Sequence, residues 1–160
     1  MKIRDIMSGD VRSCSPDDNL ALVATMMWDH DCGIVPVVNG AEKPIGVITD
    51  RDICIAVATK QRLASDISAN EVVTGEIHAC GPEDRISSAL DLMKDKRIRR
   101  LLIIDEDGTL KGLLSLNDIV VHCERGKGKE LPGFSDDDVM KALQAICEHR
   151  GPRTASSAVA

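Results

Sequence analysis

Apolar residues along the chain follow two spacings, one typical of helices and one typical of strands, in a fixed order. The helical spacing i, i+3, i+4, i+7 is followed by Leu20, Val23, Ala24 and Met27. Two aliphatic runs come next, at 33–38 and 45–49, and the polar residues between them predict a turn between two buried strands. An apolar segment from about residue 50 predicts a second helix, and residues 11–14 form a short extended lead. The predicted order is therefore β-α-β-β-α.

The same pattern returns 66 residues later without a gap. Residues 8–20 (SGDVRSCSPDDNL) align with 74–86 (TGEIHACGPEDRI), and 46–55 (GVITDRDICI) align with 112–121 (GLLSLNDIVV). One such unit cannot bury its apolar face alone, so we expect the two copies to pair face to face with pseudo-twofold symmetry. The sequence thus predicts a mixed α/β fold of the α+β kind, made of tandem β-α-β-β-α repeats.

The second copy predicts its own strands at 77–80, 99–104 and 111–115, with helices that start near 86 and 116. Pro16 and Pro82 are predicted to occupy the first turn of the helix after each lead, where proline is tolerated.

The repeats divide the chain into parts of different composition. The expected parts are a first repeat over 1–66, a second over 67–124, a linker over 125–134, a C-terminal helix over 135–150 and a flexible tail over 151–160. Ser135 is the expected N-cap of that helix, and acidic residues fill its first turn. Its apolar stripe must pack against the body or another subunit, and consists of Val139, Leu143 and Ile146.

Composition narrows the classes of function. One Trp, one Phe and no Tyr argue against modules that stack bases on aromatic side chains. The net charge of -6 opposes a nucleic-acid partner. No stretch approaches the ~20 apolar residues of a membrane span, and residues 1–10 lack the apolar core of a signal peptide. We therefore expect a cytoplasmic protein with neither a membrane nor a nucleic-acid partner.

The six cysteines form no Cys-x-x-Cys pair, so they are interpreted as small core residues in a reducing compartment. No metal site is predicted, because cysteine and histidine are not clustered. Cys14 and Cys80 occupy equivalent positions and leave open a thiol-based sensor. The chain shows no Gly-x-Ser-x-Gly, His-Glu-x-x-His or Walker loop, so we do not expect an enzyme.

A Thr/Ser-x-x-Asp motif follows a glycine-led strand in both repeats, as Thr49–Asp52 and Ser115–Asp118. This spacing is that of a capping box, in which the two side chains satisfy the first turn of a helix. The same spacing recurs at Ser15–Asp18 and Ser135–Asp138. The alternative is a ligand site, because a strand end that meets a helix start favours a phosphate. A carboxylate beside it has acceptors for the two hydroxyls of a ribose. The residues leave both interpretations open.

The twofold occurrence of Gly-hydrophobic-x-Thr/Ser-x-x-Asp at the end of a β-α-β-β-α unit resembles a pair of cystathionine-β-synthase (CBS) domains, or Bateman module. GVITDRD and GLLSLND match the pattern, and GIVPVV resembles the hydrophobic-Pro-Val strand of the family. Leu102 stands where that strand has its proline in the second copy. The resemblance covers about residues 2–124.

The resemblance implies a stand-alone regulatory module that acts on an unknown protein partner and forms a homodimer. Its ligand would be an adenine nucleotide such as AMP, ADP, ATP or S-adenosylmethionine, bound in one or both clefts as a regulator and not as a cofactor. Thr49 and Asp52 would then contact phosphate and ribose in one cleft, and Ser115 and Asp118 in the other. The residues expected to frame the ligand are Val11, Arg12, Ile34, Val35, Arg51, Ile77, His78, Arg99 and Arg100.

The basic run 94–100 gives the two clefts different charge. Arg97, Arg99 and Arg100 could neutralise phosphates at one cleft, since guanidinium groups bind phosphate in pairs of hydrogen bonds. The alternative is a solvated helix end. For the whole chain, the alternatives to nucleotide sensing are a thiol- or stress-responsive module and a scaffold without a nucleotide ligand.

Overall fold

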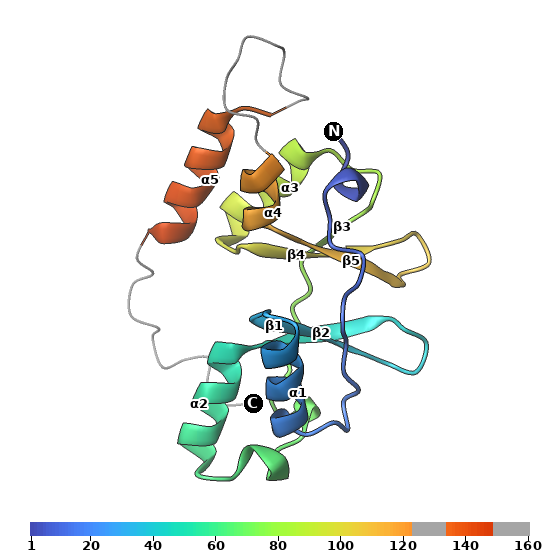
Figure 1. Cartoon of the computed structure of the whole chain (residues 1–160), viewed down its shortest axis with the longest axis vertical. Coiled ribbons are helices and arrows are strands. Elements are labelled where there is room, and N and C mark those ends of the chain that lie inside the picture. Colours follow the sequence, from blue (N-terminus) through green and yellow to red (C-terminus); the bar gives the residue numbers. More distant parts are fainter. Residues whose placement is uncertain (123–133, 149–160) are drawn as a thin grey trace.

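The computed structural model describes residues 1–122 and 134–148. Figure 1 shows two halves whose small sheets face each other at the centre, with helices on the outer sides. The first half holds α1 (Leu20–Asp29), β1 (Ile34–Val38), β2 (Pro44–Thr49) and α2 (Asp50–Lys60). The second holds β3 (Ala79–Cys80), α3 (Ile86–Lys96), β4 (Arg100–Ile104), β5 (Leu110–Ser115) and α4 (Leu116–His122). The predicted order β-α-β-β-α is therefore confirmed in the second half, and the first half follows it except that its lead makes a single bridge in place of a strand.

The hairpins have the same register in both halves. In the first, β1 pairs antiparallel with β2 and Ile34 lies opposite Thr49. In the second, β4 pairs antiparallel with β5 and Arg100 lies opposite Ser115. In each half, the first residue of the hairpin thus lies beside the Thr or Ser that directly precedes the following helix. The lead of the second repeat joins its sheet as β3, parallel to β4, and Cys14 makes a single parallel bridge to Val37.

The helices begin later than the prolines suggest. Asn19 caps α1 by accepting from the Leu22 amide at 3.0 Å. Pro16 and Pro82 lie ahead of α1 and α3 in turns that are closed by a side chain. The amide of Ser15 donates to Asp18 at 2.7 Å, and that of Gly81 to Asp84 at 2.8 Å. The prediction that both prolines sit in a first helical turn is wrong, because each proline lies in a turn closed by an aspartate and the helix begins only after that turn.

Two segments cross from one half to the other. Ile3 and Ile6 fall in the predicted first repeat, 1–66, but are buried in the core of the second half. Short helical turns η2 (Ala64–Asp66) and η3 (Ala69–Glu71) lie on either side of the predicted boundary, and Ile67 and Ala69 of the predicted second repeat are buried in the core of the first half. The core of each half therefore contains residues that the predicted boundary at residue 66 assigns to the other repeat.

The glycine of each motif allows this crossing. Ser8 and Leu113 exchange two backbone hydrogen bonds of 2.9 and 3.0 Å, and the Thr74 amide donates to Val47 at 3.4 Å. A Cβ on Gly112 would lie 2.8 Å from the Ser8 carbonyl oxygen, and one on Gly46 would lie 2.3 Å from that of Thr74. Only glycine therefore fits where the crossing segment lies on the strand.

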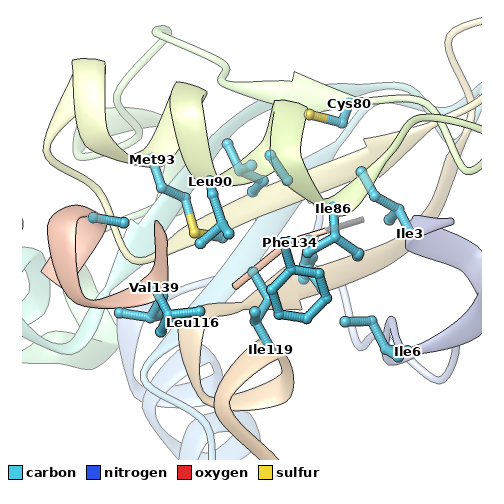
Figure 2. Packing of buried hydrophobic residues seen from close by; sticks show 14 of the residues in the cluster. Ile3, Ile6, Cys80, Ile86, Leu90, Met93, Leu116, Ile119, Phe134 and Val139 are labelled. Carbon is cyan, nitrogen blue, oxygen red and sulfur yellow. The ribbon is translucent and has the colours of Figure 1, made fainter. Parts of the chain in front are cut away.

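The C-terminal helix α5 (Asp136–Cys147) packs against α3 in the second half. Figure 2 shows Val139 beside Leu116 and Phe134 among the apolar side chains of the same core. Phe134 is only 6% exposed, although it falls in the predicted linker 125–134. Ala142 is buried where the stripe was expected to bury Leu143, which is 37% exposed. The predicted tail 151–160 and most of the linker lie outside the described residues.

Candidate functional site

Both Thr/Ser-x-x-Asp motifs form capping boxes. Asp52 Oδ2 accepts from the Thr49 amide at 2.9 Å and from Thr49 Oγ1 at 2.6 Å, and the Asp52 amide donates back to Oγ1 at 3.2 Å. Asp118 makes the same three bonds with Ser115, at 2.8, 2.7 and 3.2 Å. The local interpretation of the motif as a cap is therefore confirmed at both junctions.

The capping box leaves one carboxylate oxygen available. Oδ2 of Asp118 is committed to two donors, whereas Oδ1 has no hydrogen-bond partner among the described residues. The Ser115 hydroxyl donates its hydrogen bond to Asp118, so it cannot donate to a phosphate while the capping box is formed. A ribose hydroxyl can therefore be accepted at this junction, and a phosphate requires other donors.

A cavity of about 260 Å³ lies where the two halves meet at the second junction. The lead of the first repeat, the start of β1 and the β5–α4 junction all line it, so the pseudo-twofold pairing creates it. It brings together six of the residues predicted to contact a ligand, namely Val11, Arg12, Ile34, Arg100, Ser115 and Asp118.

Two arginines give this cavity its cationic groups. Arg100 is half-buried and forms no ion pair with another described residue. A Cβ on Gly33 would lie 3.4 Å from Arg100 Nη2, so the guanidinium group lies against the backbone of the first repeat. Arg12 lies 3.8 Å from Asp10 through its Nη2 atom. A half-buried arginine without a counter-ion is a suitable partner for an anionic ligand group.

The equivalent junction of the first repeat differs. Thr49 and Asp52 line neither this cavity nor the hollow between α1 and α2 that is described below. His78, the counterpart of Arg12, lies 3.3 Å from Glu76, the counterpart of Asp10. A basic side chain thus lies beside an acidic one next to the lead in both halves, with an arginine in one half and a histidine in the other.

The remaining predicted residues lie outside the cavity. Val35 is fully buried in the core of the first half, because alternate residues of a strand face opposite sides. The same alternation leaves Arg99 exposed while Arg100 lines the cavity. Arg51 and Ile77 line neither hollow. Arg97 is predicted to neutralise a phosphate, but its Nη2 binds Glu148, the residue that follows α5, at 2.8 Å.

Sequence reasoning missed several lining residues, among them the polar residues Asp10, His30, Asp31 and Asn117. Asn117 lies inside the second motif, SLND, and Asp10 lies beside the lead, so both could have been found from their neighbours. His30 and Asp31 follow α1 in a turn that requires a left-handed backbone at Asp31, with φ of 46°. No periodicity of the sequence indicates that turn.

The cysteines do not form a pair. Cys14 and Cys80 are buried in the cores of different halves, and the described cysteines are all free thiols. Residues 1–122 and 134–148 contain no cluster of His, Cys, Asp and Glu suited to a metal ion. Within the same ranges, no helix combines the length and apolar character that crossing a membrane requires.

Comparison with known proteins agrees with this architecture. A family model described as the CBS domain matches residues 3–59 and again 66–124. The CBS domain-containing protein YhcV of Bacillus subtilis is 33% identical over 140 residues, covering 86% of this chain and 97% of that protein. The protein MK0525 of Methanopyrus kandleri is 31% identical over 75% of this chain. The chain spans only 61% of MK0525 and 23% of a matching inosine-5'-monophosphate dehydrogenase.

Solved structures show the same fold. Hypoxic Response Protein I, crystallised with two coordinated zinc ions, superposes with a TM-score of 0.69 at 28% identity, over 76% of this chain and 98% of that one. The CBS domain pair of protein MJ0100, in complex with 5-methylthioadenosine and S-adenosyl-L-methionine, gives a TM-score of 0.69 at 19% identity, over 76% and 94%. The chain therefore belongs to the CBS domain family and carries two CBS domains that pair with each other.

Proposed function

We propose that this CBS pair is a regulatory module, not an enzyme, that binds an adenine nucleotide in the cavity at the Ser115–Asp118 junction. The observation that carries the proposal is the convergence of Asp118, Arg100 and Arg12 on one hollow between the repeats. The carboxylate can accept from a ribose, and the guanidinium groups can donate to a phosphate.

Size and lining favour a small nucleotide. The volume of about 260 Å³ is close to the lower end of the range for small-molecule sites, which is roughly 300–1,000 Å³. Val11, Ile34 and Leu113 supply apolar surface in the same cavity, which suits a flat base without aromatic partners. The complex of the MJ0100 CBS pair with two adenosine-containing ligands supports the choice of an adenine nucleotide. AMP fits these features better than a ligand with more phosphate groups.

The module would act by differential affinity. A ligand that contacts both halves stabilises one arrangement of them and shifts the population toward it. We propose that this shift is read by a protein partner in the cytoplasm and that the module acts as a homodimer. Ile55 and Val121 occupy equivalent positions in the repeats and are both exposed, at 44% and 79%. They give α2 and α4 exposed apolar side chains at matching positions, which a second copy of the chain would cover.

Asp118→Ala tests the site, because α5 offers a matched control. Asp138 makes the same three bonds with Ser135 that Asp118 makes with Ser115, but it lines neither hollow. Loss of either cap is expected to cost about 1 kcal/mol of stability. Only Asp118→Ala should also weaken AMP binding, by ~1.5–3 kcal/mol in calorimetric titration.

Asp52→Ala reports on the first junction in the same titration. We expect it to resemble the Asp138→Ala control, because Asp52 does not line the cavity. Equal AMP affinity in all three variants and the unaltered chain would mean that these carboxylates are caps and nothing more. If the unaltered chain binds no AMP, ADP, ATP or S-adenosylmethionine, the module is a scaffold and the proposal fails.

A further inference from the structure

The second half shows how this fold binds a helix. The helix α5 packs against α3 and shares a buried cluster with Leu116 and Ile119 of α4. Its Val139 lies beside Leu116 in Figure 2, and Arg97 at the end of α3 pairs with Glu148 at the end of α5. The groove between α3 and α4 is thus filled by one amphipathic helix of this chain.

The same groove is open in the first half. A hollow of about 520 Å³ lies between α1 and α2, lined by Met27 and Ile53, the repeat equivalents of Met93 and Ile119. Trp28 stands at its rim and is 86% exposed. No helix among residues 1–122 and 134–148 covers it, although its apolar floor is at the positions that α5 covers in the other half.

Differences between the grooves define what would fit. Ala24 and Cys32 stand where the second half has Leu90 and Ile98, so the floor is lower and calls for longer apolar side chains than Val139 provides. At the end of the groove the charge is reversed.

Asp31 occupies the position of Arg97, and both residues have a left-handed backbone, with φ of 46° and 54°. Where Arg97 binds an acidic helix end, Asp31 suits a basic one, which the helix dipole also favours at a C-terminus. Asp31 forms no ion pair with another described residue, so this charge is available.

The open groove shares a wall with the nucleotide cavity. Asp31, Cys32, Gly33 and Arg100 line both hollows. Arg100 comes from the second half, yet its Nη2 lies close to Gly33. A phosphate in the cavity would draw this guanidinium group toward itself and remove positive charge from the groove.

We propose that the groove between α1 and α2 is a docking site for an amphipathic helix of a partner protein, with long apolar side chains and a basic residue at its C-terminal end. Nucleotide in the neighbouring cavity strengthens this docking through Arg100. The second statement rests on the proposed function, whereas the first stands on the geometry of the groove alone.

The probe is a synthetic peptide of residues 134–148 that carries V139L, A142L and E148K, and the control peptide has the unaltered sequence. Trp28 is the only tryptophan of the chain and both peptides lack one, so its emission reports the groove. We expect the altered peptide to shift Trp28 emission to shorter wavelength and to bind about tenfold or more tightly than the control.

Variants of the protein locate the contact. Ala24→Leu fills the floor as in the second half and should weaken peptide binding about tenfold or more, whereas Thr25→Leu, on an exposed part of α1, should not. Asp31→Arg should reverse the preference between the two peptides, and Asp29→Arg at the end of α1, outside the groove lining, should leave it unchanged. Absence of a saturable Trp28 signal, or an equal response of Ala24→Leu and Thr25→Leu, overturns the docking site.

Peptide titrations with and without AMP distinguish helix docking from its coupling to the nucleotide. AMP is expected to tighten peptide binding about fivefold or more in the unaltered chain and to have no such effect in Arg100→Gln. If calorimetry shows AMP binding but the peptide does not bind, docking is overturned and the proposed function stands. If both bind without affecting each other, the coupling is overturned. A Trp28 shift that depends on protein concentration alone, and is lost in Ala24→Leu, assigns the groove to a second copy and overturns the partner helix.

Discussion

Burial makes the thiols of Cys14 and Cys80 poor nucleophiles. Loss of solvent raises the pKa of each thiol to about 11, and the nearby Asp18 and Asp84 add to this effect. Cys54 and Cys147, in contrast, are exposed. Because the thiolate is the reactive form, the equivalent pair is unsuited to sensing oxidants while the protein is folded.

We expect a variant that retains only Cys14 and Cys80, with serine at the other four positions, to react with Ellman's reagent only after unfolding at about pH 8. The raised pKa also means that their burial stabilises the fold below the ordinary thiol pKa of 9.0 and that this contribution is lost as the pH rises through about 11. Rapid labelling of the folded variant at about pH 8 would contradict this and would restore a thiol-based function.

At the scale of single residues, sequence reasoning identified the motif but not its surroundings. Three Thr/Ser-x-x-Asp boxes have the same internal geometry, at residues 49, 115 and 135. What separates Asp118 from Asp138 is the cavity formed by chain from the other half. No local pattern carries that information, because it depends on how the two halves pair.

Among the elements, α5 shows how one aromatic side chain fixes a helix. Phe134 precedes the Ser135 cap and is buried with Ile119 and Ile86 in the core of the second half. The apolar stripe of residues 135–150 predicted a helix, but a lone Phe in a Gly- and Lys-rich segment carried no periodic signal. The structure therefore extends the docked segment by one residue that the sequence assigned to a linker.

Phe134→Ala should destabilise the protein by ~3–5 kcal/mol in urea unfolding, the range for removing a buried aromatic side chain. Leu143→Ala on the exposed side of α5 is the matched control and should cost well under half of that, because Leu143 is 37% exposed. Similar losses in the two variants would mean that Phe134 does not anchor the helix.

In the whole molecule, exposed charges hold the crossing segments in place. Arg62 Nη1 lies 2.7 Å from Glu71, and this ion pair joins the segment after α2 to η3. A hydrogen bond from Arg62, followed by one from the Ser68 amide, lowers the pKa of Glu71 to about 2. Lys2 and Arg4 similarly contact Glu83 and hold the N-terminal segment on the second half, which lowers the pKa of that carboxyl group.

The lowered pKa of Glu71 predicts a defined response to acid. Its contribution is present above the ordinary glutamate pKa of 4.5 and is lost as the pH falls through about 2. Thermal unfolding should therefore show a smaller decrease in midpoint over this window for Glu71→Gln than for the unaltered chain. Glu106→Gln, in the turn between β4 and β5, should follow the unaltered chain. Parallel curves for all three proteins would show that the Arg62 contact does not stabilise the fold.

The pseudo-twofold pairing was predictable from the repeat, whereas the exchange of segments was not. The sequence offset aligns Ile3 with Ala69 and Ile6 with Val72, so each crossing segment looks like part of the unit that follows it. The requirement for glycine at residues 46 and 112 was visible, but its cause, the close approach of Thr74 and Ser8, is a tertiary contact.

The pairing of Ser8 with Leu113 ties the N-terminal segment, residues 1–8, to the wall of the cavity at the second junction. Leu113 lines the cavity and lies two residues before Ser115, and Ser8 lines the same cavity. A displacement of the first few residues would therefore strain this cavity before it disturbed the hairpin that follows in sequence. The N-terminal segment is thus mechanically coupled to the distant repeat, so that a force applied to it would change the shape of the cavity.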